Sequence, residues 1–376
     1  MRDPMKIRGE FPVTRSYTYL NHAAVSPLPR RVAAELARLN EDRVHHGIVM
    51  FPEWMKRIGE VRGLLARLIG AEDQEIAFVG NTSEGLSAVA GGIDWRPGDA
   101  VLVSRPDFPS NIYPWLDLER KGVQVIFVER RGGIVDPGDV RRALRKGARL
   151  LAVSSVDFLT GGASDLQALG ALCREEGLLF CVDAIQSLGV LPIDVRSSGI
   201  HFLAAGGHKW LLGPLGCGML YVDREAVRWL HPTQIGWRSV ENEEDFFNIR
   251  YELKSGAAKL EPGTPNVSGI YALGAAVELL LEAGIDAVRR RIFQLNDLLA
   301  AGLSERGLEI VTPMSPAGRS GILTFRPHGE PLPLFKAMLK ERVLVSERAG
   351  LIRLSPHFYN DEADAVRFFE VLDRLS

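Results

Sequence analysis

Lys209 is a lysine set between an apolar run and a glycine-rich run, in the stretch FLAAGGHKWLLGPLGCGMLYV (202–222). A lysine that is removed from water has a lowered pKa and becomes a nucleophilic amine. Such an amine can form a Schiff base with an aldehyde. The ordinary alternative is that the ammonium reaches solvent while the stem of the side chain covers apolar surface.

Asp183 ends a strongly apolar segment, LLFCVD (178–183), where a carboxylate must be capped, paired or functional. One interpretation is a helix cap or a loop hydrogen bond. The functional interpretation is that Asp183 holds a proton on a buried heterocyclic nitrogen. Gln186, three residues further on, is placed to reach the same ligand.

The segment GNTSEG (80–85) offers free amides and hydroxyls at the expected start of a helix. Such a helix start is a ready anion site, and Thr82 and Ser83 would supply its hydroxyl groups. The alternative is an ordinary helix cap.

An anion site, a carboxylate for a pyridine nitrogen and an amine for an aldehyde together describe pyridoxal 5′-phosphate (PLP). A nucleotide site is disfavoured, because the chain has neither GxxxxGK[ST] nor a GxGxxG order in GPLGCG. An NAD- or ATP-binding α/β enzyme therefore lacks the phosphate loop that it would need.

Seven short apolar runs could form the sheet that positions these groups. They read as continuous hydrophobic strands separated by helical patterns such as 82–93 and 165–177, which predicts a mostly parallel sheet with helices on both faces. Ligands bind outside the carboxyl ends of such strands, where the polar segments above converge. The expected strands are 75–79, 99–104, 123–129, 149–156, 178–184, 200–206 and 217–222.

We predict an α/β fold with three parts. Residues 1–28 form an N-terminal segment bordering the active site, residues 29–260 form the large cofactor-binding domain, and residues 261–376 form a smaller C-terminal α+β domain. Amphipathic helices are expected near 30–45 and 53–69. The C-terminal part should hold a long helical stretch (268–307), three short strands and a final helix.

The composition gives a cytoplasmic location as the default and indicates neither a nucleic-acid nor a membrane partner. The chain has 376 residues, 46% hydrophobic content and a formal net charge of −2, so nothing attracts it generally to nucleic acid or to an anionic membrane. No apolar run is long enough to span a bilayer, and no secretory signal is recognisable. Three cysteines in apolar surroundings indicate buried, reduced thiols, and the eight histidines show no metal-ligand spacing.

The segments VDAIQSLGVLPIDV and GGHKWLLGPLGCGMLYV resemble those of the class V aminotransferase family of fold type I PLP enzymes, which includes cysteine desulfurases, kynureninase and isopenicillin N epimerase-like proteins. The resemblance runs from YLNHAAVSPLP to IRLSPHFYN. It implies that Lys209 forms the imine with the cofactor, that Asp183 pairs with the pyridine nitrogen and that Gln186 bonds the ring hydroxyl oxygen. The remaining implied cofactor contacts are Thr82, Ser83 and His208 at the phosphate, and Gly263 and Thr264 of EPGTPN at the phosphate of a neighbouring subunit in a homodimer.

Several positions depart from the desulfurase pattern. Phe108 stands where desulfurases stack a histidine on the cofactor, and as in kynureninase-like members it can stack on the pyridine ring but cannot move protons. Phe158 stands in place of an asparagine. A serine common in the family is replaced by Gly206. The segment VSERAGLIRLSPHFYN (345–360) has no cysteine, which argues against a desulfurase that relays sulfur through a persulfide.

The resemblance also implies a substrate pocket. Arg353 matches the arginine that grips the α-carboxylate, for which a bidentate guanidinium is suited, although a surface arginine is the plain alternative. Asn21 and His22 belong to the stretch that borders the substrate, with His22 as a second acid or base. Trp237 lines the same pocket or belongs to the core.

The predicted function is an amino-acid aminotransferase. In this hypothesis Lys209, displaced from the cofactor by the substrate amine, takes and returns the Cα proton. A PLP-dependent lyase acting on a C–S or C–C bond, as in kynureninase, and an epimerase are the alternatives, since the first step is common to all. A non-catalytic PLP-fold protein is disfavoured because Lys209, Asp183 and Arg353 are all present.

Overall fold

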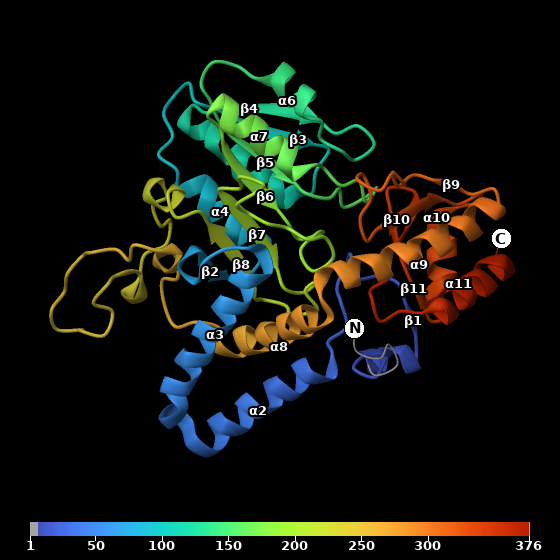
Figure 1. Cartoon of the computed structure of the whole chain (residues 1–376), viewed down its shortest axis with the longest axis horizontal. Coiled ribbons are helices and arrows are strands. Elements are labelled where there is room, and N and C mark those ends of the chain that lie inside the picture. The colour runs from blue at the N-terminus through green and yellow to red at the C-terminus, as the bar shows by residue number, and fades with distance from the viewer. Residues whose placement is uncertain (1–6, 376) are drawn as a thin grey trace.

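The computed structural model describes residues 7–375, and its centre is a seven-stranded sheet of order β2-β8-β7-β6-β5-β3-β4 (Figure 1). Strands β3 to β7 run parallel to one another, while β8 is antiparallel to both β7 and β2. The strands are β2 (Ile76–Val79), β3 (Ala100–Arg105), β4 (Gln124–Glu129), β5 (Ala148–Ser154), β6 (Leu179–Asp183), β7 (Phe202–Gly206) and β8 (Gly218–Val222).

Helices cover both faces of this sheet because successive strand residues point to opposite sides. In β5, Leu150 belongs to the core on one face and Leu151 to the core on the other. The first face is covered by α4 (Thr82–Gly92) and the short α5 (Tyr113–Leu116). The second is covered by α3 (Phe51–Ile69), α6 (Pro137–Ala143), α7 (Leu166–Glu176) and α8 (Val267–Ala283), with α2 (Arg30–His46) packed outside against α8.

A smaller unit holds a four-stranded antiparallel sheet of order β12-β13-β10-β9. Its strands are β9 (Glu309–Ile310), β10 (Leu323–Arg326), β12 (Ser346–Arg348) and β13 (Leu351–Leu354), and its helices are α9 (Ile285–Glu305), α10 (Pro331–Lys340) and α11 (Glu362–Leu375). The N-terminal segment joins this unit, because β1 (Thr18–Tyr19) pairs in parallel with β11 (Val343–Leu344). The chain then continues to Ala23, Ala24 and Val25 at the site described below.

The fold agrees with the sequence-based expectation of an α/β protein with a mostly parallel seven-stranded sheet. The long helical stretch is broken, since Gly284 takes a positive φ of 79° and separates α8 from α9. The expected boundary at residue 260 would assign α8 to the small domain, but α8 packs in the core of the large domain. In α9, the residues from Leu299 onward pack in the core of the small domain. We therefore propose a boundary within α9. Residues 1–6 of the expected N-terminal segment lie outside the described residues.

Within the described residues, no single helix is long and apolar enough to cross a membrane. Helices α8 and α9 meet the length and composition criteria only as a pair, and the pair is bent by 79°.

Candidate active site

The polar segments converge on a cavity of about 390 Å³ at the carboxyl ends of the central strands. It combines one carboxylate, an amine and two guanidinium groups with hydroxyls and aromatic rings. The lining residues are Ala23, Ala24, Val25, Asn81, Thr82, Ser83, Phe108, Ser110, Phe158, Asp183, Ile185, Gln186, His208, Lys209, Arg348 and Arg353.

Lys209 projects into this cavity from the turn after β7, with its Nζ 5.6 Å from the centre of the Phe108 ring. Removal from water, opposed by the charge of Asp183, lowers the pKa of Lys209 from 10.5 to about 8. The amine is therefore far more available as a nucleophile near neutral pH than an ordinary lysine.

Asp183 ends β6 and is almost fully buried. Its Oδ1 accepts a hydrogen bond of 2.9 Å from the amide of Ile185, whereas Oδ2 is buried without a partner. Burial raises the pKa of Asp183 from 3.8 to about 7. A buried carboxylate oxygen without a partner is costly, and a protonated ring nitrogen is the kind of group that would satisfy it.

Gln186 is held in one orientation by two hydrogen bonds. Its Oε1 accepts from the indole of Trp210 at 2.8 Å, and its Nε2 donates to the carbonyl of Ala23 at 3.0 Å. An amide nitrogen carries two hydrogens. The second hydrogen of Gln186 is therefore available to a ligand oxygen in the cavity.

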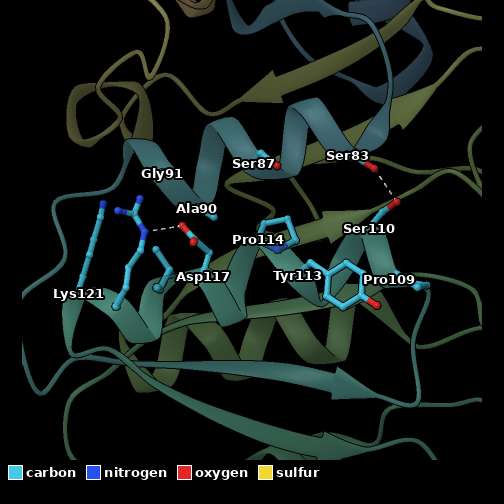
Figure 2. Close-up of a pocket in the computed structure, with 12 residues that line it drawn as sticks. Ser83, Ser87, Ala90, Gly91, Pro109, Ser110, Tyr113, Pro114, Asp117 and Lys121 are labelled. Atoms are coloured by element: carbon cyan, nitrogen blue, oxygen red, sulfur yellow. Dashed lines mark hydrogen bonds and ion pairs between the residues drawn. The ribbon is translucent and has the colours of Figure 1, made fainter.

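The anion end of the cavity lies at the start of α4. Asn81 caps the helix by accepting from the amide of Glu84 at 3.0 Å, and the Thr82 hydroxyl accepts from the amide of Gly206 at 2.9 Å. The hydroxyl oxygens of Ser83 and Ser110 lie 2.7 Å apart (Figure 2). Ser110, which the sequence reasoning missed, supplies a second hydroxyl at the end where Gly206 lacks one.

A second cavity, of about 500 Å³, meets the first at this serine pair and runs between α4 and α5 (Figure 2). Its charged residues are Asp117, Arg120 and Lys121, and Asp117 and Arg120 form a surface ion pair. It has neither a reactive amine nor a buried carboxylate, so the chemistry belongs to the first cavity.

A buried ion pair fixes the loop that carries Phe108 and Ser110. Asp107 lies 3.0 Å from the guanidinium of Arg130, and both side chains are almost fully excluded from water. Asp107 also accepts hydrogen bonds from Ser104, Asn111 and Ser154. The loop is thereby tied to the ends of three strands, β3, β4 and β5, beside the cavity.

Arg353 approaches from β13 of the small unit and is 2% exposed. Its Nη1 donates to the carbonyl of Phe158, while Nε is buried without a partner. Burial lowers the pKa of Arg353 to about 10, and the charge of Arg348 adds to this effect. An unsatisfied guanidinium N–H in the cavity suits a carboxylate ligand.

His22 takes a different place from the one expected for an acid or base beside the substrate. Its ring is fully buried, its Nδ1 lies 2.8 Å from the carbonyl of Ser355, and its Nε2 lies 2.8 Å from the hydroxyl of Tyr359. Burial lowers the pKa of His22 to about 3. With both nitrogens occupied, His22 joins the N-terminal segment to the small unit.

Four further expected site residues also lie outside the lining of this cavity. Asn21 accepts a hydrogen bond from Ser346, and Trp237 is 44% exposed beside Phe246. Thr264 is exposed and follows Gly263 on the same side of the molecule as Trp237, whose indole nitrogen would be 3.9 Å from a Cβ at Gly263. A single copy of the chain does not bring these residues to Lys209.

The comparisons with known proteins place the chain in a family. The family model for "Aminotransferase class-V" matches residues 18–367, so the chain belongs to the class V aminotransferase family. A "Probable cysteine desulfurase" of Methanothermobacter thermautotrophicus is 30% identical over 98% of this chain and 97% of its own length. An "Uncharacterized aminotransferase" of Bacillus subtilis is 28% identical over 96% and 95% of the two chains.

Solved structures give the same result for the fold. The apo structure of a cysteine desulfurase from Thermococcus onnurineus superposes with a TM-score of 0.90 at 27% identity, over 100% of this chain and 98% of the other. A variant of C-DES with glycine covalently linked to the PLP cofactor superposes with a TM-score of 0.92 at 22% identity, over 98% and 99% of the two chains. The cofactor of this chain is PLP, and Lys209, the unpartnered Asp183 oxygen and the α4 hydroxyls fit it.

The relatives overturn the functional prediction. Those that cover the chain are repeatedly named cysteine desulfurases, so the prediction that this activity is unlikely is wrong, and the lyase alternative is better supported than the aminotransferase assignment. The exclusion rested on the absence of a cysteine in residues 345–360. Breaking a C–S bond needs an amine base and an electron-accepting cofactor, which this site provides without that thiol. The three cysteines, Cys173, Cys181 and Cys217, are free and buried, as expected.

Proposed function

We propose that this protein is a PLP-dependent lyase that cleaves the C–S bond of cysteine or of a cysteine-derived amino acid. The observation that carries the proposal is one cavity lined by Lys209, Asp183 and Arg353, in which an oxygen of Asp183 and the Nε of Arg353 are buried without a partner. Such a set binds and activates an α-amino acid. The choice of sulfur chemistry rests on the names of the relatives.

In this proposal each residue of the cavity has its own role. When bound, the cofactor supplies an acceptor for the electron pair released at Cα. Arg353 holds the substrate carboxylate, and the Asp183 carboxylate keeps the ring nitrogen protonated. Gln186 donates to the ring oxygen, and Thr82, Ser83 and Ser110 hold the phosphate. Lys209 removes the proton from Cα, for which a lowered pKa makes it suitable.

The test is to supply L-cysteine and L-cystine to the PLP-loaded protein and to quantify sulfide, persulfide, pyruvate and alanine. We expect sulfur release with wild type and a loss of at least about 10³-fold with Lys209→Ala, because the amine acts in every step. The matched control is Lys56→Ala, an exposed lysine on α3. Amino-group transfer from a sulfur-free amino acid, with no sulfur release from either substrate, would contradict the proposal.

We also propose that the enzyme is a homodimer with shared active sites. An extension of residues 235–251 projects from the body (Figure 1, yellow), and its side chains expose much apolar surface, with Phe247 fully exposed and Ile249 86% exposed. Exposed apolar surface of this kind marks an interaction site. In the dimer, Gly263 and Thr264 of the partner subunit would reach the phosphate.

We further propose a cytoplasmic location. The three free thiols suit a reducing compartment.

A further inference from the structure

The active-site cavity contains a second arginine, Arg348, to which the sequence reasoning gave no role. Arg348 ends β12, and a two-residue turn of Ala349 and Gly350, with φ of 49° and 79°, leads into β13. Positive φ at both positions is the signature of a tight type I′ hairpin turn. The arginine therefore sits on a short, well-defined hairpin.

The register of this hairpin places Arg348 and Arg353 on one face. Ser346 pairs with Arg353, and Arg348 pairs with Leu351. Residues two apart on a strand point the same way, and paired residues share a face. Both guanidinium groups consequently point toward the cavity, with Arg353 buried and Arg348 exposed at the mouth.

Arg348 has no acidic partner in the described part of the chain. Its guanidinium makes one hydrogen bond to the described residues, from Nη1 to the carbonyl of the neighbouring Glu347 at 3.0 Å. The Glu347 carboxylate accepts from the amide of Gly350 instead. Among the residues that line the cavity, Asp183 is the one carboxylate, and it belongs to the ring-nitrogen end. The end of the lining that holds the two arginines thus carries no carboxylate, although the charge of Asp157, outside the lining, acts on the buried Arg353.

A substrate with one carboxylate would satisfy Arg353 and leave Arg348 without an anion. We propose that Arg348 selects substrates whose sulfur-bearing side chain ends in a second anionic group, either a carboxylate or a sulfur oxyanion. This inference rests on the proposed C–S lyase function for the identity of the scissile bond. The charge selection itself rests on the hairpin and does not depend on which bond is cleaved.

The test compares two thioethers of nearly equal shape, S-carboxymethyl-L-cysteine and S-carbamoylmethyl-L-cysteine, which differ in the charge of the distal group. Binding to the PLP-loaded protein is followed by the change in the cofactor absorption, and turnover by product release. We expect wild type to favour the carboxylate by about tenfold in Kd, as for a charge-assisted pair at a partly open site. L-Cystine and S-sulfo-L-cysteine then separate a distal carboxylate from a sulfur oxyanion.

Arg348→Gln should abolish the preference while leaving the carbamoyl compound within about twofold of wild type, and Arg348→Lys should retain part of it. Arg326→Gln, an exposed arginine on β10 outside the cavity, is the matched control.

Equal affinity of wild type for the two thioethers would overturn the inference. An equal loss of affinity for both thioethers in Arg348→Gln would also overturn it, because Arg348 would then only support the hairpin. Weaker binding of PLP by that variant would overturn it too, because Arg348 would then belong to the phosphate site. Preference without any C–S cleavage would refute the proposed function and leave the charge selection standing. C–S cleavage without a preference between the two thioethers would support the proposed function and refute the charge selection.

Discussion

At the scale of single residues, the burial of Lys209 makes its amine more reactive and lowers the stability of the folded chain. Its pKa falls from 10.5 in the unfolded chain to about 8 in the folded chain, so the charged form is disfavoured by folding. The full penalty applies below about pH 8 and disappears as the pH rises from 8 to 10.5. We expect apo Lys209→Met to exceed apo wild type in free energy of unfolding by about 1–3 kcal/mol at pH 7.

Urea denaturation of the two apo proteins between pH 7 and 10 checks this expectation, with the difference shrinking above pH 8. Lys56→Met, at an exposed position, controls for the general effect of the substitution. A difference that stays constant with pH would mean that packing, and not the charge of Lys209, causes it.

At Asp183, the charge of the side chain can be removed without a change in its shape. Replacing it by asparagine keeps the shape but removes the negative charge that stabilises a protonated ring nitrogen. We expect Asp183→Asn to bind PLP and to lose about 10²-fold or more in kcat, the scale of one positioned electrostatic group. Asp117→Asn, at an exposed ion pair, is the control. Full activity of Asp183→Asn at saturating PLP would remove Asp183 from the mechanism.

The sequence predicted some of these site residues much better than others. Lys209, Asp183 and Gln186 follow apolar strands directly, so the parallel sheet alone brings them to one rim. Arg348 and Ser110 were missed because their places depend on a hairpin from the small unit and on a loop between strands. His22 was misplaced since its surroundings come from Ser355 and Tyr359, more than 330 residues away.

At the scale of elements, strands and helices with strong periodicity were predicted closely, and α10 was missed. That helix starts at Pro331 with a second proline two residues later, and two of its five large apolar side chains, Leu332 and Leu339, are exposed, so the segment resembles a loop in the sequence. The break between α8 and α9 was also missed, because both sides of Gly284 favour helix and only the fold demands its positive φ.

The loop of residues 105–111 is the element on which the cofactor site depends most. Its anchor is the buried pair of Asp107 and Arg130, and removing one partner leaves the other charge buried alone. We expect Arg130→Met to lower the free energy of unfolding by about 3–5 kcal/mol and to weaken PLP binding. The neighbouring Arg131→Met is the matched control, since Arg131 is 70% exposed and its surface pair contributes about 1 kcal/mol or less.

Urea denaturation of the apo proteins and titration with PLP measure both effects. Equal losses in the two variants would show that the buried pair has no special role in holding the loop.

At the scale of the whole molecule, the proposed dimer concerns residues that the family resemblance assigns to the site and that lie outside the cavity in one copy of the chain. Gly263, Thr264 and Trp237 lie outside the cavity lined by Lys209, and Trp237 belongs to the extension of residues 235–251 with its exposed apolar side chains. A second copy that covers the extension would bury this apolar surface and bring the missing groups to the phosphate end. The exposed apolar extension and the position of Gly263 and Thr264 therefore both favour the same dimer, although they involve different residues.

Charges placed on the extension test that assembly. In Phe247→Asp with Ile249→Asp, two carboxylates replace side chains that are 100% and 86% exposed in one copy, so the monomer should keep its folded stability, while a buried apolar contact between copies would be lost. We expect this variant to sediment as a monomer at concentrations where wild type is a dimer, and to bind PLP about tenfold or more weakly because the phosphate loses the groups of the partner subunit. Val366→Asp, at an exposed position on α11, should change neither property. A monomeric variant with undiminished PLP affinity would separate the two halves of the proposal, keeping the dimer and removing the shared site, whereas a wild-type monomer at all concentrations would refute both.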